Sequence, residues 1–516
     1  MTPDTLSTIE INAEYQLVLE GLQQTQDHFF VTGKAGTGKS TLLRVLRQKL
    51  QKAMVILAPT GIAALNVEGE TIHSFFWFDA NITVEKAAEK GLKQTRNKLL
   101  QTIDLIVLDE ISMVRADLLD CIDVFLKAAL QSTKPFGGKQ LLFIGDLYQL
   151  PPIVTKDEAH YFSEVYKSPY FFAAQLFMRH GFEMTIIELT HVYRQQDQQF
   201  INFLAAVRKK ELTAQQLTQF NQQCFHHKKK LSDQSIYLTT TNRQVDDINK
   251  SKLATLTTAK KTFLAEFSDS FKATAPTDIE LDLKVGAQVM FLNNDSQGRW
   301  VNGTIGHIKT IDATNEELII SCNNGNDVEV KPYTWTMYRY VYNASTKQLN
   351  AESVGSFTQF PIRLAWAITI HKSQGKTFDH AYIDLSRGTF TAGQAYVALS
   401  RCRSMDGLCL KAPLRLTDIK IDTAIHAFFN QQQHTDIKLV DPKTDFILTA
   451  ISKKQSIIIN YVNAQDVTST RKINPLRLIK KLSNGTTHQL IYAFCHQRQT
   501  YRGFRFDRII DYRLFE

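Results

Sequence analysis

The feature that most constrains the fold of this chain is a glycine-rich stretch, GKAGTGKST, at residues 33–41. It fills the pattern G-x-x-x-x-G-K-[ST] without a mismatch. An apolar run at residues 28–31 precedes it, and apolar residues with helical spacing follow at 42–46. In this strand, loop and helix order, backbone N–H groups and the positive helix end point at a phosphate chain. The stretch predicts a nucleoside triphosphate site, and its flanks disfavour a chance match in a glycine-rich turn.

Two carboxylates stand where a P-loop enzyme needs them. Lys39 is expected on the β and γ phosphates and the Ser40 hydroxyl on Mg²⁺. Asp109 and Glu110 follow an apolar strand at 103–108. We expect Asp109 to hold Mg²⁺ and Glu110 to orient and deprotonate the attacking water. Adjacent acids are common by chance, so the assignment depends on their place after a strand.

Three further side chains are candidates for phosphate chemistry. Gln149, in the segment GDLYQLPP, follows the next apolar strand and can contact the γ-phosphate or its water, while Asp146 can be a simple turn residue. Charge on the transferred phosphoryl group calls for arginines from outside the P-loop domain. Arg194 follows an apolar strand and Arg401 ends a helix. Taken alone, each arginine is better explained as a surface residue.

Length and composition indicate a large globular protein. At about 100–200 residues per domain, 516 residues predict three to five domains. The sequence has nothing like a signal peptide and no apolar run of about 18 residues, so we expect a cytoplasmic protein without membrane contact. The six cysteines form no C-x-x-C pair. We expect buried thiols and neither disulfides nor structural zinc.

The positive charge is concentrated at the C-terminal end. The net charge is +9, and residues 445–516 hold twelve Lys or Arg against five Asp or Glu, so 12 − 5 = +7 belongs to this tail and +2 to the rest. A basic tail suits a polyanionic partner.

Alternating strand and helix patterns predict an α/β fold with parallel sheets. Residues rich in Lys, Glu and Gln interrupt the first region and are explained either by a solvated helix or by a small insertion that touches substrate. Asn-Gly turns between short strands predict a small β-barrel inside the second region. The predicted domains are a first α/β core at 1–183 with the insertion near 76–101, a second core at 184–283 and 361–430, the inserted barrel at 284–360, a linker at 431–444 and a small β domain at 445–516.

The order of these motifs, from about residue 10 to 425, resembles superfamily-one helicases of the PIF and RecD-like branch. The matching segments are Gln16, GKAGTGKST, APTG at 58–61, TIHSF at 71–75, Asp109-Glu110, GDLYQLPP, the Arg194 segment, HKSQGKT at 371–377 and the Arg401 segment.

This resemblance implies two RecA-like cores with ATP and Mg²⁺ between them. Arg194 and Arg401 would complete the site from the second core, and Gln16 would contact adenine. The ATP-binding residues implied are Gln16, Gly33, Gly36, Thr37, Gly38, Lys39, Ser40 and Thr41.

The resemblance also implies single-stranded DNA across both cores, duplex junctions as substrates, movement from 5′ to 3′ and a monomer. Residues 85–101 would correspond to a strand-separating wedge and 284–360 to a Src-homology-type barrel. His73 alone is equally explained as a core histidine. The implied DNA contacts, all side chains that can bond phosphate oxygens, are Thr60, His73, Ser74, Asn242, Lys372 and Ser373.

The tail resembles a WYL domain, a small barrel seen in bacterial regulators, although the name-giving triad is here His488-Gln489-Leu490. Arginines interleaved with aromatic residues could bind phosphates and stack on bases. The alternative is a barrel core of aromatic residues with a solvated arginine rim. The candidates are Arg498, Arg502, Phe504, Arg505 and Arg508.

Three functions follow in order of preference. The first is an ATP-dependent DNA helicase with an accessory nucleic-acid-binding tail. The second is a DNA-stimulated ATPase that remodels protein on DNA without unwinding. The third is a regulator whose tail senses a ligand.

Overall fold

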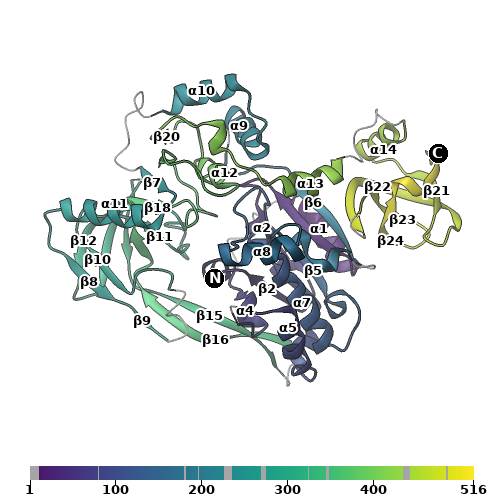
Figure 1. Cartoon of the computed structure of the whole chain (residues 1–516), viewed down its shortest axis with the longest axis horizontal. Helices are drawn as coiled ribbons and strands as arrows, with labels where there is room; N and C mark the ends of the chain where they lie inside the picture. Colours follow the sequence, from purple (N-terminus) through teal and green to yellow (C-terminus); the bar gives the residue numbers. More distant parts are fainter. Residues whose placement is uncertain are drawn as a thin grey trace.

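The computed structural model describes residues 11–79, 81–178, 182–195, 197–225, 235–268, 275–323, 325–343, 348–433, 442–483 and 486–515. Figure 1 shows α/β cores in the middle, with a β-rich region and α11 on one side and the C-terminal tail on the other. In these ranges no helix is long and apolar enough to span a membrane.

The first core is a parallel sheet in the order β3-β2-β4-β5-β1-β6. Alternate residues of β1 serve its two faces, because Phe29 and Val31 pack with α1 and α2 while Phe30 packs with α7. The predicted α/β class is therefore confirmed. The elements are α1 (Ala13–Gln24), β1 (His28–Gly33), α2 (Lys39–Lys49), β2 (Met54–Ala58), α3 (Gly61–Asn66), β3 (Glu70–Thr71), α4 (Ile72–Phe75), β4 (Leu105–Leu108), α7 (Ala116–Ala129), β5 (Gln140–Ile144), α8 (Lys156–Val165) and β6 (Glu183–Leu189).

Strand β6 belongs to this first sheet, so the domain boundary predicted between residues 183 and 184 is wrong. It runs parallel to β1 in a register from His28↔Met184 to Gly33↔Leu189. An apolar run indicates a strand but carries no information about which neighbour it pairs with. The chain leaves the first core only after this strand.

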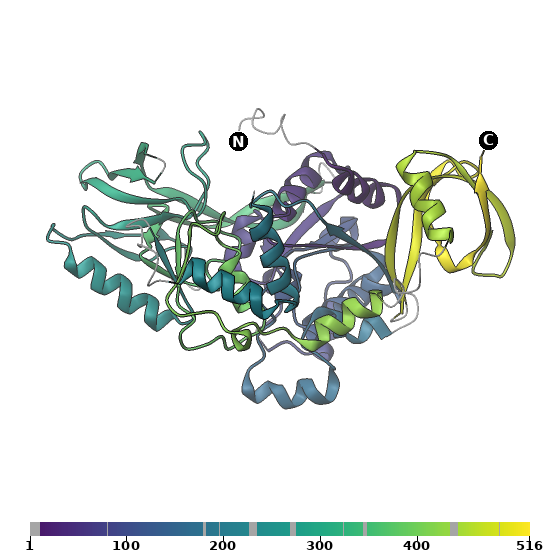
Figure 2. The ribbon, with the colours of Figure 1, turned by 90° about the horizontal axis from the view of Figure 1, so that it is seen from above.

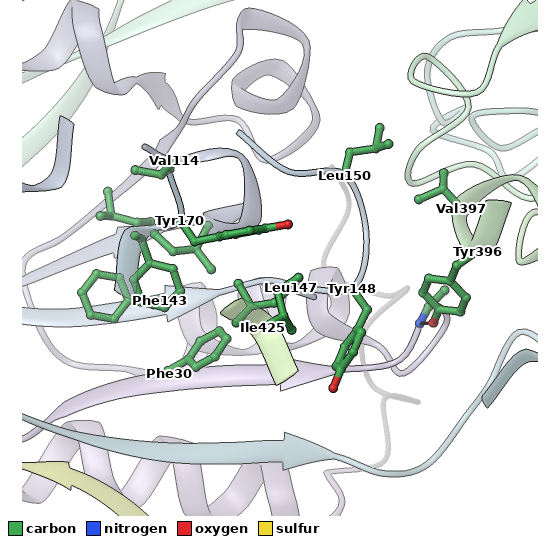
Figure 3. Packing of buried hydrophobic residues seen from close by; sticks show 14 of the residues in the cluster. Phe30, Val114, Phe143, Leu147, Tyr148, Leu150, Tyr170, Tyr396, Val397 and Ile425 are labelled. Carbon is green, nitrogen blue, oxygen red and sulfur yellow. Dashed lines mark hydrogen bonds between the residues drawn. The ribbon is translucent and has the colours of Figure 1, made fainter. Parts of the chain in front are cut away.

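The second core is a four-stranded parallel sheet in the order β18-β7-β19-β20. Helix α13 (Thr423–Gln433) leaves it and returns to the first core, where Phe428 stacks on Phe172 at 4.4 Å. Figure 3 shows Ile425 of α13 in one apolar cluster with Phe30 of the first core. The other elements are α9 (Gln198–Lys209), α10 (Ala214–Cys224), β7 (Ile236–Thr239), α11 (Asn242–Thr255), β18 (Ala367–Thr369), β19 (Ala381–Ile383), α12 (Gln394–Leu399) and β20 (Leu408–Leu410).

The inserted region forms three antiparallel sheets, β14-β13-β12-β11-β17, β15-β16-β9 and β10-β8. Among the described residues they do not close into a barrel, and the region begins at Lys261 rather than 284 because β8 pairs with β10. The strands are β8 (Lys261–Leu264), β9 (Glu266–Phe267), β10 (Glu280–Leu283), β11 (Gln288–Phe291), β12 (Ile305–Asp312), β13 (Glu317–Cys322), β14 (Asp327–Val330), β15 (Tyr333–Asn343), β16 (Gln348–Gln359) and β17 (Ile362–Leu364).

The long hairpin of β15 and β16 reaches back to the first core (Figure 1). The Tyr340 N–H donates to the Glu70 carboxylate at 3.2 Å, and the Tyr340 hydroxyl accepts from the Ile56 N–H at 3.2 Å. The inserted region is therefore fastened to the first core as well as to the second.

The insertion near 76–101 folds as α5 (Val84–Leu92) and α6 (Lys98–Thr102) on the flank of the first core. Helix α5 packs tightly on α7, because a Cβ at Gly91 would lie 2.4 Å from the Phe125 carbonyl oxygen. Leu92 is 63% exposed at the end of this helix. The wedge role remains a prediction.

The tail is an antiparallel sheet in the order β25-β21-β22-β23-β24, with one helix. Within the described residues it does not close into a barrel. The first part of β22 pairs with β21, whereas residues 480–483 pair with β6 of the first core beyond a bulge between Pro475 and Arg477. The tail sheet and the sheet of the first core are therefore joined through β22, and the tail lies beside the first core in Figures 1 and 2. The elements are α14 (Pro442–Ser452), β21 (Ile457–Val462), β22 (Thr468–Ser483), β23 (Thr486–Cys495), β24 (Thr500–Arg505) and β25 (Ile509–Leu514).

Tail side chains also complete an apolar cluster of the first core. Ile479, Leu490 and Tyr492 are buried in the same cluster as Leu17 and Phe29. Removing these residues would expose part of the motor to water.

We predict that Ile479→Ala destabilises the first core by about 2–4 kcal/mol, because it removes buried methylene groups and leaves a cavity. Urea denaturation, with the loss of DNA-stimulated ATP hydrolysis as its readout, measures this change in stability. The control is Ile510→Ala, since Ile510 is 62% exposed on β25. Equal unfolding midpoints for both variants would contradict the shared core.

Candidate nucleotide site

The glycine-rich stretch folds as a tight loop that opens α2. Gly36 and Gly38 have φ of +83° and +86°, which side chains other than glycine rarely adopt. The Lys39 ammonium donates to the carbonyls of Gly33 and Lys34 at 2.8 and 3.0 Å. No side chain caps the start of α2, so its first N–H groups are available to an anion.

A cavity of about 1040 Å³ lies over this loop, between the two cores. It brings together most of the predicted ATP-site residues, although they come from five separate parts of the chain. Its lining is Tyr15, residues 35–41, Glu110, Gln149, Tyr193, Arg194, Asp197, Gly375, Thr377, Arg401, Arg403 and Ser404.

The two carboxylates lie at the end of β4. Glu110 has a φ of +48°, a strained conformation for this residue type, and its carboxylate accepts from the Gln374 amide at 3.1 Å. Burial raises the pKa of Glu110. Burial, together with the negative charge of Glu110, raises the pKa of Asp109 to about 7. A cation beside these groups would stabilise both charged forms, so the pair is suited to a metal ion.

Two arginines face the loop with only neutral partners. The fully buried Arg401 donates to the Val397 carbonyl and the Ser400 hydroxyl, both at 2.8 Å. Burial and the charge of Arg194 lower the pKa of Arg401 to about 9. Burial lowers the pKa of Arg194 to about 10. Among the described residues neither forms an ion pair, although the charges of Glu110 and Asp146 act on Arg401. Cations that are removed from water without a direct ion pair favour an anionic ligand.

Arg194 reaches the cavity from the first core, not from the second as expected. It follows β6, and the Tyr193 N–H donates to the Gly36 carbonyl at 2.8 Å. A Cβ on Gly36 would lie 2.5 Å from the Arg194 Cβ. This segment therefore covers the loop, and of the two predicted arginines Arg401 alone comes from the second core.

Three residues of this site have no counterpart in the sequence predictions. The Tyr15 hydroxyl donates to the Gly38 carbonyl at 2.7 Å. The Tyr396 hydroxyl on α12 accepts from the Ala35 N–H at 2.9 Å, which connects the second core to the loop (Figure 3).

The predicted residue Gln16 is exposed and donates to Glu20, outside the cavity lining, so its adenine contact remains a prediction.

The third residue without a counterpart in the sequence predictions is Arg208. Its contact with Asp146 shows that Asp146 is more than a turn residue. Its guanidinium pairs with the Asp146 carboxylate at 2.9 Å and lies 4.4 Å from the centre of the Tyr148 ring. The same carboxylate accepts from the Gln149 amide at 3.3 Å. Asp146 therefore positions Gln149. The spacing of Asp146 and Gln149 could have indicated this contact, but nothing near Arg208 in the sequence does.

Comparison with known proteins agrees with this geometry. Residues 8–218 match the model of PIF1-like helicases and residues 443–514 that of the WYL domain. The ATP-dependent DNA helicase Pif1 of Bdellovibrio bacteriovorus is 32% identical over 414 residues, 78% of this chain and 88% of that protein. The chain belongs to the PIF1-like helicase family. It is an ATP-hydrolysing DNA helicase, and both resemblances predicted from the sequence are confirmed.

Solved structures of PIF1-like helicases share this fold. Bacteroides Pif1 in complex with ADP-AlF4 gives a TM-score of 0.75 at 36% identity, over 83% of this chain and 98% of that one. Bacteroides Pif1 bound to single-stranded DNA gives 0.58 at 35% identity, with the same coverage of both chains. The domain arrangement described here is therefore closer to that of the ADP-AlF4 complex.

The residues predicted to contact DNA in this PIF1-like helicase differ in how exposed their side chains are and in whether these are already hydrogen-bonded. Thr60 and Asn242 are exposed at the starts of α3 and α11, and Lys372 is exposed in the second core. Ser74 donates to the Glu70 carboxylate at 2.7 Å. Ser373 is fully buried, and its hydroxyl donates to the Ile370 carbonyl, so here it supports the backbone. Burial lowers the pKa of the neighbouring candidate, His73.

The candidate DNA-binding residues of the tail also differ in exposure and in their partners. Arg498 and Arg502 are exposed, Arg508 is half-buried, and Arg505 pairs with Asp507 at 2.6 Å. Phe504 is 4% exposed and packs edge-on against Tyr461 in the tail core. Because β24 turns this ring inward, Phe504 is a core residue and not an exposed stacking surface.

Proposed function

We propose that this helicase moves from 5′ to 3′ along single-stranded DNA and unwinds duplexes at junctions, acting as a monomer. The observation that carries the motor assignment is a pair of arginines that line the cavity over the glycine-rich loop, the half-buried Arg194 from the first core and the fully buried Arg401 from the second. The polarity is supported by kinship alone.

Each residue of the cavity has a proposed role in ATP hydrolysis. Lys39 binds the β and γ phosphates, and Ser40 with Asp109 would hold Mg²⁺, which would supply positive charge against the phosphate oxygens. The half-buried carboxylates of Asp109 and Glu110, with Glu110 and the exposed Ser40 lining the cavity, fit such a cation. Glu110 deprotonates the attacking water.

The remaining groups orient the water and stabilise charge. Gln149, held by Asp146, positions the water beside the γ-phosphate. Arg194 and Arg401 stabilise the charge that develops on the transferred group. Both arginines already hold hydrogen bonds to backbone carbonyls, so little reorganisation is needed when the phosphate arrives.

Movement along DNA is expected because the two arginines belong to different cores. Arg194 belongs to the segment that covers the loop of the first core, and its guanidinium donates to the Ser400 carbonyl of the second core at 3.3 Å. Arg401 moves with the second core. Closure on ATP and reopening after hydrolysis would shift the second-core contacts, Asn242 and Lys372, relative to Thr60.

Unwinding of two partial duplexes tests this function, one with a 5′ single-stranded extension and one with a 3′ extension. Opening of the 5′-extended duplex alone supports the proposal. If neither opened while single-stranded DNA still stimulated ATP hydrolysis, the protein would be a translocase that remodels complexes on DNA. Opening of the 3′-extended duplex alone would refute the polarity.

We further propose that exposed tail arginines bind the DNA strand. The double substitution Arg498→Gln with Arg502→Gln should weaken single-strand binding and lower the slope of log K against log salt by about 0.7 for each phosphate that is no longer neutralised. Fluorescence anisotropy with labelled oligothymidine measures both. A control of equal charge change is Lys453→Gln with Lys454→Gln, exposed after α14. Equal salt slopes in the two variants would contradict the assignment.

A further inference from the structure

A second cavity, of about 670 Å³, lies on the other side of the glycine-rich loop. It forms where the end of β1, strand β6, helix α9, helix α13 and tail strand β22 come together. It shares no lining residue with the ATP cavity. Figure 1 shows α13 passing beside β6 on its way to the tail. Only a tail docked on β6 completes this cavity.

The cavity contains three cations that are available to an anion. Lys34, Lys209 and Arg477 line it, and in the part of the chain that the structure describes their side chains form no hydrogen bond or ion pair. Arg477 is partly buried, which lowers its pKa. Its nearest opposing charge, Glu14, is already engaged by the Thr190 hydroxyl at 2.6 Å.

The residues that line the cavity carry more positive than negative charge. Glu188 and Glu211 line the cavity, and Asp146 pairs with Arg208 at its edge. The lining holds four cations, Lys34, Arg208, Lys209 and Arg477, against the carboxylates of Glu188 and Glu211, so 4 − 2 = +2. Asp146, which pairs with Arg208, and Glu14, whose charge acts on Arg477, lie outside the lining and offset this excess. Arg208 pairs with both Asp146 and Glu188, whereas Lys34, Lys209 and Arg477 form no ion pair among the described residues. An anion would relieve the cost of the partly buried arginine.

The other walls suit an aromatic ring and a hydrogen-bonding group. Phe429 is partly exposed and stacks on Tyr148 with ring centres 5.5 Å apart. The Thr32 hydroxyl is buried at 1% exposure and has no hydrogen-bond partner among the described residues. A cavity volume of about 300–1,000 Å³ is typical of small-molecule sites. The dimensions therefore accommodate a ligand of nucleotide size.

We propose that this cavity binds a nucleoside phosphate, with its phosphate between Arg477 and Lys209 and its base against Phe429. The chemistry is shared by a free nucleotide and by one nucleotide of a DNA strand. This inference goes beyond the proposed function and does not depend on unwinding. The ligand would join the tail to Lys34 of the loop and to β6, the strand that leads to Arg194. Its binding is therefore expected to alter the rate of ATP hydrolysis.

Isothermal titration of the full chain tests the site, with the ATP cavity first saturated with ADP, Mg²⁺ and aluminium fluoride. AMP, inorganic phosphate and the tetranucleotide dT4 are the probes. We expect one AMP site, weakened at least tenfold by Arg477→Gln and by Lys209→Gln. Arg513→Gln, an exposed tail arginine on β25, is the matched control and should bind like the wild type.

The outcomes separate cleanly. Absence of AMP binding, or equal affinity in wild type and Arg477→Gln, overturns the site. AMP binding no tighter than phosphate overturns the nucleotide-sized ligand. Tighter Arg477-dependent binding of dT4 than of AMP identifies the ligand as part of a strand, and the reverse identifies a free nucleotide.

Discussion

Arg401→Ala is expected to lower the kcat of DNA-stimulated ATP hydrolysis by about 10³–10⁵-fold, the range for arginines that stabilise phosphoryl-transfer charge. ATP binding should change far less, because the glycine-rich loop and Lys39 remain intact. Steady-state hydrolysis and nucleotide titration measure the two effects separately. Arg401→Lys should recover little, because a lysine cannot reproduce the planar fork that bonds Val397 and Ser400.

Two controls protect this prediction. Arg387→Ala removes an exposed arginine of the same core and should leave kcat unchanged. Because Arg401 is fully buried, thermal melting must show that the variant is folded. A folded Arg401→Ala protein with wild-type kcat would refute the role.

Lys39→Ala should reduce DNA-stimulated ATP hydrolysis by at least about 10²–10³-fold, because it removes the positive charge aimed at the phosphates. Burial lowers the pKa of Lys39, while Asp146 and Glu110 act to raise it. Lys49→Ala, an exposed lysine at the end of the same helix, is the matched control. Unchanged turnover in Lys39→Ala would show that the loop does not serve hydrolysis.

The glycine-rich loop and the residues after β4 and β5 could be predicted because their chemistry depends on local order along the chain. The structure brings Lys39, Glu110, Gln149 and Arg401 to one cavity, as predicted. Their individual roles remain predictions. Arg208 could not be found, because its partner Asp146 lies 62 positions away and only the fold brings them together.

The part of the fold that the sequence could not predict was mainly which strands pair with each other. The pattern around residues 184–189 identified a strand but not its neighbour, so β6 was placed in the wrong core. The tail was expected to close on itself for a similar reason, since nothing in the sequence of β22 shows that residues 480–483 pair with β6. Phe504 and Ser373 were chosen by residue type, and burial decides their availability.

The pairing of β6 with β22 has a consequence during synthesis. The paired residues Ile186 and Lys480 are 480 − 186 = 294 positions apart. At about 5–20 residues per second, the edge of β6 waits roughly 15–60 s on the ribosome before its partner is made. An unpaired strand edge invites association with other chains. Nascent chains of this helicase on the same messenger RNA are therefore expected to need chaperones until the last strands emerge from the ribosome.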